Sequence, residues 1–133
     1  MEASEGVVRA VLEGNQGFYR AFETLDVRQM ESVWAKDEEI RCVHPGWGLI
    51  TGWTDVMNSW ATIFENTSLM HFRITDPQVY VSGDCAWVVC VENITTVIDA
   101  TVSELKVLTT NIFVNRDQRW LMVHHHGSPM HRT

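Results

Sequence analysis

The stretch from residue 85 to residue 97, Cys-Ala-Trp-Val-Val-Cys-Val-Glu-Asn-Ile-Thr-Thr-Val, decides the fold class. It is rich in β-branched and aromatic residues and predicts a long β-strand. Residues 86–91 are apolar at every position, so both faces of this strand need cover. We expect a helix to cover one face and a second copy of the chain to cover the other.

The elements on either side of this strand predict an α+β fold. Apolar residues at helical spacing come early in the chain, and strand patterns separated by turns come late. Asp76-Pro77 interrupts one strand pattern and predicts a bulge or bend there. We expect N-terminal helices and a strongly curved mixed, mostly antiparallel sheet that forms a cone with an interior pocket. The predicted helices are 7–24, 27–35 and a third from Trp53 or Thr54 to about residue 65, and the predicted strands are 38–43, 49–51, 69–75, 77–81, 85–97, 101–115 and 119–126.

Length and charge limit the class of protein. The 133 residues predict a single domain, 1–133, with a core at about 7–129 and a polar tail at 130–133. Ten Lys and Arg against 17 Asp and Glu give a formal charge of −7, which disfavours nucleic acid and membrane surfaces as partners. The acidic first residues have no apolar run of the signal-peptide type, and the odd number of cysteines, three, fits reduced thiols. We therefore expect a cytoplasmic protein.

Several motifs in this order resemble the SnoaL-like, nuclear transport factor two-like superfamily. They are Leu25-Asp26 at a helix end, His44-Pro45-Gly46 after a strand, Ile50-Thr51-Gly52 before a helix, and Trp-Leu-Met-Val-His-His-His-Gly-Ser at 120–128. The resemblance covers about residues 7–129 and implies a cone-shaped barrel, a deep pocket and a homodimer through the outer sheet face. The final motif is also similar to the association domains of calcium/calmodulin-dependent kinases.

The superfamily includes ketosteroid isomerases, but this chain departs from their pattern. The positions of their tyrosine, their base and their second acid fall at Phe18, His44 and Thr110. Phe18 has no donor and Thr110 is a far weaker acid than a carboxyl group, so the steroid-isomerase reaction is not expected. The pocket arginine of the kinase association domains aligns with Asn111. A shift of one residue in this hairpin leaves both Thr110 and Asn111 as candidates.

His44 is the first candidate catalytic residue, because it occupies the place of the family's base. An unperturbed imidazole has a pKa near 6.5, which suits acid–base chemistry at pH 7. The alternative is a histidine that bonds to loop backbone or lines a pocket.

The block His124-His125-His126 gives two alternatives, because neighbouring strand residues point to opposite faces. In the first register, His124 and His126 enter the pocket beside Asn111 and Phe113. In the second, His125 is the one histidine that enters, together with Leu121 and Val123. We favour the first, with His126 as a second catalytic residue and His124, Asn111 and Phe113 as ligand-binding residues.

Aromatic residues complete the predicted site. Trp47 follows the His44 loop and could cap a pocket, whereas Trp60 lies on the apolar stripe of a helix. Tyr19 could supply the donor that Phe18 lacks, although a step of one residue turns it by about 100° and predicts that it faces elsewhere. The three ligand-binding candidates from this group are Tyr19, Trp47 and Trp60.

These observations predict a domain that binds a small hydrophobic or amphipathic molecule. Such a domain could be an enzyme of the isomerase, cyclase or hydratase type that uses pocket histidines. The alternative hypothesis is a non-catalytic homodimerisation or association module. His44, His124 and His126 could hold a divalent metal, but no carboxylate partner is evident, so we expect no metal and no cofactor.

Overall fold

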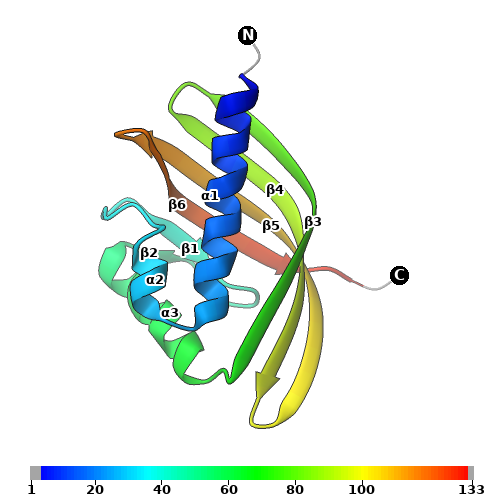
Figure 1. The fold of residues 1–133 in the computed structure, drawn as a ribbon. Coiled ribbons are helices and arrows are strands. Elements are labelled where there is room, and N and C mark those ends of the chain that lie inside the picture. Colours follow the sequence, from blue (N-terminus) through cyan, green and yellow to red (C-terminus); the bar gives the residue numbers. More distant parts are fainter. Residues whose placement is uncertain (1–3, 132–133) are drawn as a thin grey trace.

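The computed structural model describes residues 4–131, and it confirms the α+β class. Within these residues six strands form one sheet in the order β2-β1-β6-β5-β4-β3; β1 and β6 pair in parallel, and the other neighbouring strands pair antiparallel. Figure 1 shows α1 lying along one face of the sheet. The elements are α1 (Glu5–Thr24), α2 (Val27–Glu31), β1 (Arg41–Val43), β2 (Ile50–Thr51), α3 (Trp53–Glu65), β3 (Leu69–Ser82), β4 (Cys85–Ile98), β5 (Thr101–Arg116) and β6 (Arg119–Pro129).

Helix α1 begins and ends with specific caps. The Ser4 hydroxyl accepts a hydrogen bond from the backbone N–H of Val7, which satisfies one of the free donors of the first turn. Leu25 ends the helix in the left-handed conformation, with φ of 55°. A Cβ at Gly14 would lie 3.4 Å from the Trp120 carbonyl oxygen, so the missing side chain lets β6 approach α1 closely. None of the helices at residues 4–131 is both long and apolar enough to span a membrane.

Helix α2 is shorter than predicted, because the chain after it joins the sheet. The backbone N–H of Ala35 donates to the Met122 carbonyl, and the N–H of Met122 donates to the Val33 carbonyl, both at 2.9 Å. These bonds to β6 replace the helical bonds that the prediction for 27–35 required. The strand predicted at 38–43 is likewise limited to β1, where β6 supplies the partner.

Strand β3 continues through the predicted interruption as a bulged strand. Its register with β4 shifts between Thr75 and Gln78. Asp76 has a φ of 54° and Pro77 lacks an N–H, so this pair cannot continue the regular ladder. The predicted bulge is confirmed, and the two predicted strands at 69–75 and 77–81 are one strand.

A second bulge, in β6, determines which side chains enter the core. Phe113 pairs with Met122 and Ile112 pairs with His124, so Val123 is an extra residue in β6. Met122 and His125 are three positions apart, yet both are buried against the helices because the extra residue resets the alternation.

Candidate functional site

Five polar side chains meet in the core between α1 and the sheet. Asn15 and Tyr19 come from α1, Glu92 from β4, Asn111 from β5 and His125 from β6. All five are buried, and Glu92 and His125 are each only 2% exposed. Buried polar groups are costly unless they are hydrogen-bonded, so their mutual bonding is what makes this cluster tolerable.

Hydrogen bonds join these side chains in a directed chain. The Tyr19 hydroxyl donates to Glu92 Oε2 at 2.5 Å. Asn111 Nδ2 donates to the Tyr19 hydroxyl at 3.1 Å and to Asn15 Oδ1 at 2.9 Å. His125 Nδ1 lies 2.6 Å from Asn111 Oδ1. We call the path from His125 through Asn111 and Tyr19 to Glu92 the buried relay.

The buried relay determines the tautomer of His125. Asn111 Oδ1 is a carbonyl oxygen and can only accept, so His125 Nδ1 carries the hydrogen. A neutral ring then has its lone pair on Nε2, which forms no hydrogen bond with residues 4–131. That nitrogen can accept a hydrogen bond or a proton from a bound molecule.

Burial changes the acid–base behaviour of the relay. It raises the pKa of Glu92 to about 7, although the hydrogen bond from Tyr19 favours the charged form and opposes this rise. Burial, followed by the charge of Glu92, raises the pKa of Tyr19 well above its usual value. Burial, followed by the neighbouring imidazole of His44, lowers the pKa of His125 well below its usual value. At neutral pH, Glu92 can therefore take up or release a proton while Tyr19 and His125 stay neutral.

His44 lies beside this cluster but bonds elsewhere. Its Nε2 is 2.9 Å from Ser59 Oγ, and the Ser59 hydroxyl donates to the Val56 carbonyl at 2.6 Å. The imidazole packs edge-on against Trp60 and Trp47, with ring centroids 4.5 and 4.9 Å away. Burial lowers the pKa of His44 to about 4. The ring is neutral at pH 7 and is anchored to α3, in contrast to the loop-backbone bonding considered from the sequence.

The structure brings most of the predicted site residues into the core. Tyr19, Trp60, Asn111 and Phe113 are all buried. The prediction that Tyr19 faces away was wrong, because α1 turns both Phe18 and Tyr19 toward the sheet.

The favoured register for the three histidines was wrong. His126 is exposed and His124 is half-buried on the outer face of the sheet, the face away from the helices, whereas His125 faces inward. The alternative register placed His125 correctly but named Leu121 and Val123 beside it. In the structure Met122 is the fully buried residue next to them. The bulge at Val123 is the physical reason in both cases. Trp47 lies on the surface and is 44% exposed.

Sequence reasoning missed two members of the cluster, Asn15 and Glu92, and offered His125 only in the register that it did not favour. Glu92 shares the register of the buried residues Ala86, Val88 and Cys90, but the sequence does not show which register faces the core, because residues 86–91 are apolar in both. A carboxyl group in the register of a core-facing strand predicts a buried, perturbed acid. The choice between the two registers of His125 had no local signal, because the bulge depends on the pairing of β6 with β5.

Aromatic side chains occupy much of the space between α1 and the sheet, where a pocket was expected. Phe18, Phe22 and Trp60 pack edge-on against one another, with Phe72 beside Phe22. The indole N–H of Trp60 is buried and has no hydrogen-bond partner among the described residues.

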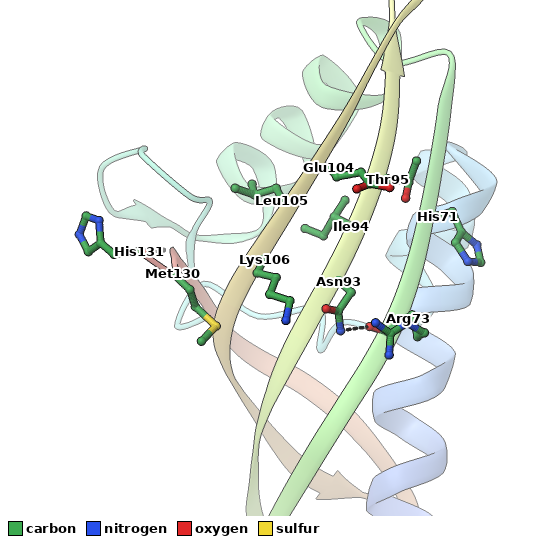
Figure 2. A pocket seen from close by; sticks show the side chains of 10 residues that line it. All are labelled: His71, Arg73, Asn93, Ile94, Thr95, Glu104, Leu105, Lys106, Met130 and His131. Atoms are coloured by element: carbon green, nitrogen blue, oxygen red, sulfur yellow. Dashed lines mark hydrogen bonds between the residues drawn. The ribbon is translucent and has the colours of Figure 1, made fainter. Parts of the chain in front are cut away.

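Two of the cavities formed by residues 4–131 lie outside this space. One, of about 700 Å³, is lined by residues of β3, β4 and β5 and by the end of the chain after β6 (Figure 2). The other, of about 570 Å³, lies beside α3 and is lined in part by Trp47 and Ser59. Within residues 4–131, no cluster of three or more His, Cys, Asp or Glu side chains is placed to hold a metal ion.

Comparisons with known proteins point to one family. A model of the SnoaL-like domain matches residues 11–132. A solved structure from Streptomyces avermitilis, a protein of the NTF2-like family proposed to be a dehydratase, is 33% identical, with a TM-score of 0.89 over 96% of this chain and 99% of that chain. A proposed calcium/calmodulin-dependent protein kinase type II association domain from Thiobacillus denitrificans is 27% identical, with a TM-score of 0.79 over 89% of this chain and 93% of that one.

A curated plant protein is also similar. The F-box protein SKIP8 of Arabidopsis thaliana is 28% identical over 122 residues, which are 92% of this chain and 50% of that protein. The chain therefore spans about half the length of this curated relative.

Proposed function

The chain belongs to the SnoaL-like domain family, and from this premise we propose that it binds a small, mostly apolar molecule and moves a proton on it at the buried relay. The observation that carries the proposal is Glu92, a buried carboxyl group whose pKa is about 7. General acid–base catalysis works best when the pKa of the catalytic group lies near the working pH. Isomerisation, cyclisation and dehydration all need such a step, and the similarity to a proposed dehydratase favours this class.

Each member of the relay has a distinct role in the proposal. Ionised Glu92 accepts a proton from a carbon atom of the ligand and, once protonated, returns it to another atom. The Tyr19 hydroxyl holds one oxygen of Glu92 in place. His125 Nε2 and the indole N–H of Trp60 supply an acceptor and a donor for a polar group of the ligand.

The proposal also concerns the shape of the interior. We infer that the sheet curves around α1 as a cone and that the ligand enters between them, displacing aromatic side chains such as Phe18 and Phe72. His44, predicted to be the base, instead contacts the ligand site through Trp60 and His125. His126 faces the opposite side of the sheet and takes no part.

Hydrogen–deuterium exchange on carbon tests the proposal. Enolisable ketones and β-hydroxy carbonyl compounds are incubated with the protein in D₂O, and loss of the C–H signal is followed by proton NMR. We expect exchange that falls by at least about 100-fold in Glu92→Gln. Glu65→Gln, at an exposed carboxylate on α3, is the matched control and should exchange like the wild type. Equal exchange by Glu92→Gln would reject Glu92 as the proton carrier.

A homodimerisation module is the second candidate, and the outer sheet face supports it. Tyr80 and Trp87 stack there with ring centroids 4.5 Å apart, although they are 56% and 36% exposed. Leu108 is exposed on the same face. Exposed aromatic pairs beside aliphatic side chains are typical of protein interfaces.

Sedimentation of substituted chains tests this second candidate. Trp87→Arg should convert a dimer into a monomer, because a charge would be buried at the centre of the interface. Leu49→Arg, at a loop residue that is 65% exposed, is the control and should leave the dimer intact. A wild-type monomer at micromolar concentration would reject the homodimer.

A further inference from the structure

We propose that the cavity on β3, β4 and β5 is a second ligand site that binds an amphipathic anion, such as a short aliphatic carboxylate. Its volume of about 700 Å³ lies within the range of small-molecule sites. The site is separate from the buried relay: Asn93 and Lys106 project from the outer face, whereas the relay lies on the inner face.

Two cations share one row of this cavity. Arg73 pairs with Asn93 across β3 and β4, and Asn93 pairs with Lys106 across β4 and β5. Neighbouring strands are about 4.8 Å apart, so the Cα atoms of Arg73 and Lys106 are separated by about 10 Å. Their long side chains can therefore converge above Asn93. Figure 2 shows Lys106, Asn93 and Arg73 side by side in this row.

Neither cation is neutralised by a residue between 4 and 131. Arg73 and Lys106 form no ion pair with any residue between 4 and 131, and both are exposed. Glu104 is the acidic residue among those that line the cavity. It lies two residues from Lys106 on the same face of β5, opposite Thr95, and forms no ion pair with either cation. In a chain with a formal charge of −7, two cations that share one row of a cavity and form no ion pair within residues 4–131 favour an anion.

The Asn93 side chain keeps this row in order. Its Nδ2 donates to the Arg73 carbonyl at 2.9 Å and to Thr75 Oγ1 at 3.1 Å. These bonds tie β4 to β3 at the level of the cations. A planar carboxylate can then accept two parallel hydrogen bonds from the Arg73 guanidinium while Lys106 contributes a point charge.

An apolar side chain supplies the second half of the recognition. Met130 continues the row beyond Lys106, because its backbone N–H donates to the Lys106 carbonyl at 2.9 Å. Met130 lines the cavity, lies on the same face as Lys106 and is 43% exposed. Burying its side chain under an aliphatic tail is favourable, so a ligand with both an anionic head and a short apolar tail fits better than an inorganic anion.

Binding of octanoate, with octan-1-ol as the uncharged probe of equal length, tests the proposal by amide NMR on the full chain. We expect octanoate to shift the signals of β3, β4 and β5 near Asn93, and octan-1-ol to bind at least about tenfold more weakly. Arg73→Gln combined with Lys106→Gln should raise the octanoate Kd by about tenfold or more. Arg20→Gln combined with Arg28→Gln, at exposed arginines on α1 and α2, removes the same charge and should leave the Kd unchanged.

Other outcomes would overturn the site. Equal binding of octan-1-ol and octanoate would reject the role of the anionic group. An equal rise in the octanoate Kd for the Arg20→Gln and Arg28→Gln control would show that only the net charge of the chain matters. Shifts confined to residues around Glu92 would place octanoate at the buried relay instead. Glu92→Gln should bind octanoate like the wild type, so failure of the proposed catalytic function leaves this test unaffected.

Discussion

Glu92 and Asn93 are neighbours in β4, yet they meet opposite conditions on the two faces of the sheet. Glu92 points toward α1, is 2% exposed and depends on Tyr19 for a hydrogen bond. Asn93 points to the outer face, is half-buried and bonds within its own strand pair. Polar groups on the inner face are coupled because no water can replace a lost partner, whereas those on the outer face can be solvated one by one.

The largest difference between the faces should appear in apolar side chains. Phe113 is fully buried on the inner face, so Phe113→Ala should lower the free energy of unfolding by about 3–5 kcal/mol. Val114 is half-buried on the outer face, and Val114→Ala should cost less than about 1.5 kcal/mol. Urea unfolding of both variants measures this, and equal losses would contradict the division into a core face and an outer face.

The next effect is a pH dependence that comes from Glu92. Its pKa is about 7 in the folded state, against 4.5 ordinarily, so between these values the folded chain holds a proton that the unfolded chain has lost. The contribution of Glu92 to the free energy of unfolding is therefore complete below pH 4.5. It falls as the pH rises toward 7 and is constant above that pH. Glu92→Gln removes this titration. The free energy of unfolding of the variant minus that of the wild type should therefore rise by about 3 kcal/mol between pH 4.5 and pH 8, because the wild type loses stability over that range.

Denaturant unfolding across that pH range measures the difference. The lowered pKa of His44 acts in the opposite direction, because stability from a neutral buried imidazole rises between about pH 4 and 6.5. His44 is present in both proteins, so its contribution cancels in the comparison. A pH-independent difference between Glu92→Gln and wild type would show that Glu92 is not a perturbed acid.

A smaller loss should follow from cutting the relay at its centre. Asn111→Leu leaves the His125 Nδ1 hydrogen and the side-chain oxygen Oδ1 of Asn15 without these partners. The free energy of unfolding should therefore fall by about 2 kcal/mol. Combining it with His125→Leu should be non-additive by more than about 0.5 kcal/mol, because the second substitution removes one of the orphaned groups. Strict additivity in this double-mutant cycle would mean that the relay is not a coupled network.

The smallest effect is expected one residue away from His125. His126 is exposed on the outer face, so His126→Ala should change the free energy of unfolding by no more than about 0.5 kcal/mol. The same measurement on His125→Ala should give a clear loss. A large effect at His126 would indicate that a partner covers this face in solution.

Part of the site could be predicted from the sequence. The resemblance singled out Asn111, and Phe113 lies two residues further along the same strand; both are buried on the inner face. The same rule applied to 85–97 puts Glu92 on one face with Ala86, Val88 and Cys90, but it does not show that this face meets α1, because both faces are apolar. Tyr19 was misplaced because helical spacing sets the angle from Phe18 but not how α1 is rotated against the sheet.

The sequence by itself determined the elements and their order, because helix caps, turn residues and apolar spacing act over a few residues. The long strand at 85–97, the helix that ends at Leu25 and the bulge at Asp76-Pro77 all follow from such local chemistry. Only the tertiary structure decided which histidine is buried, since the extra residue at Val123 exists only relative to the pairing of β6 with β5. It also decided the pKa of Glu92, because burial under α1 is a property of distant segments packed together.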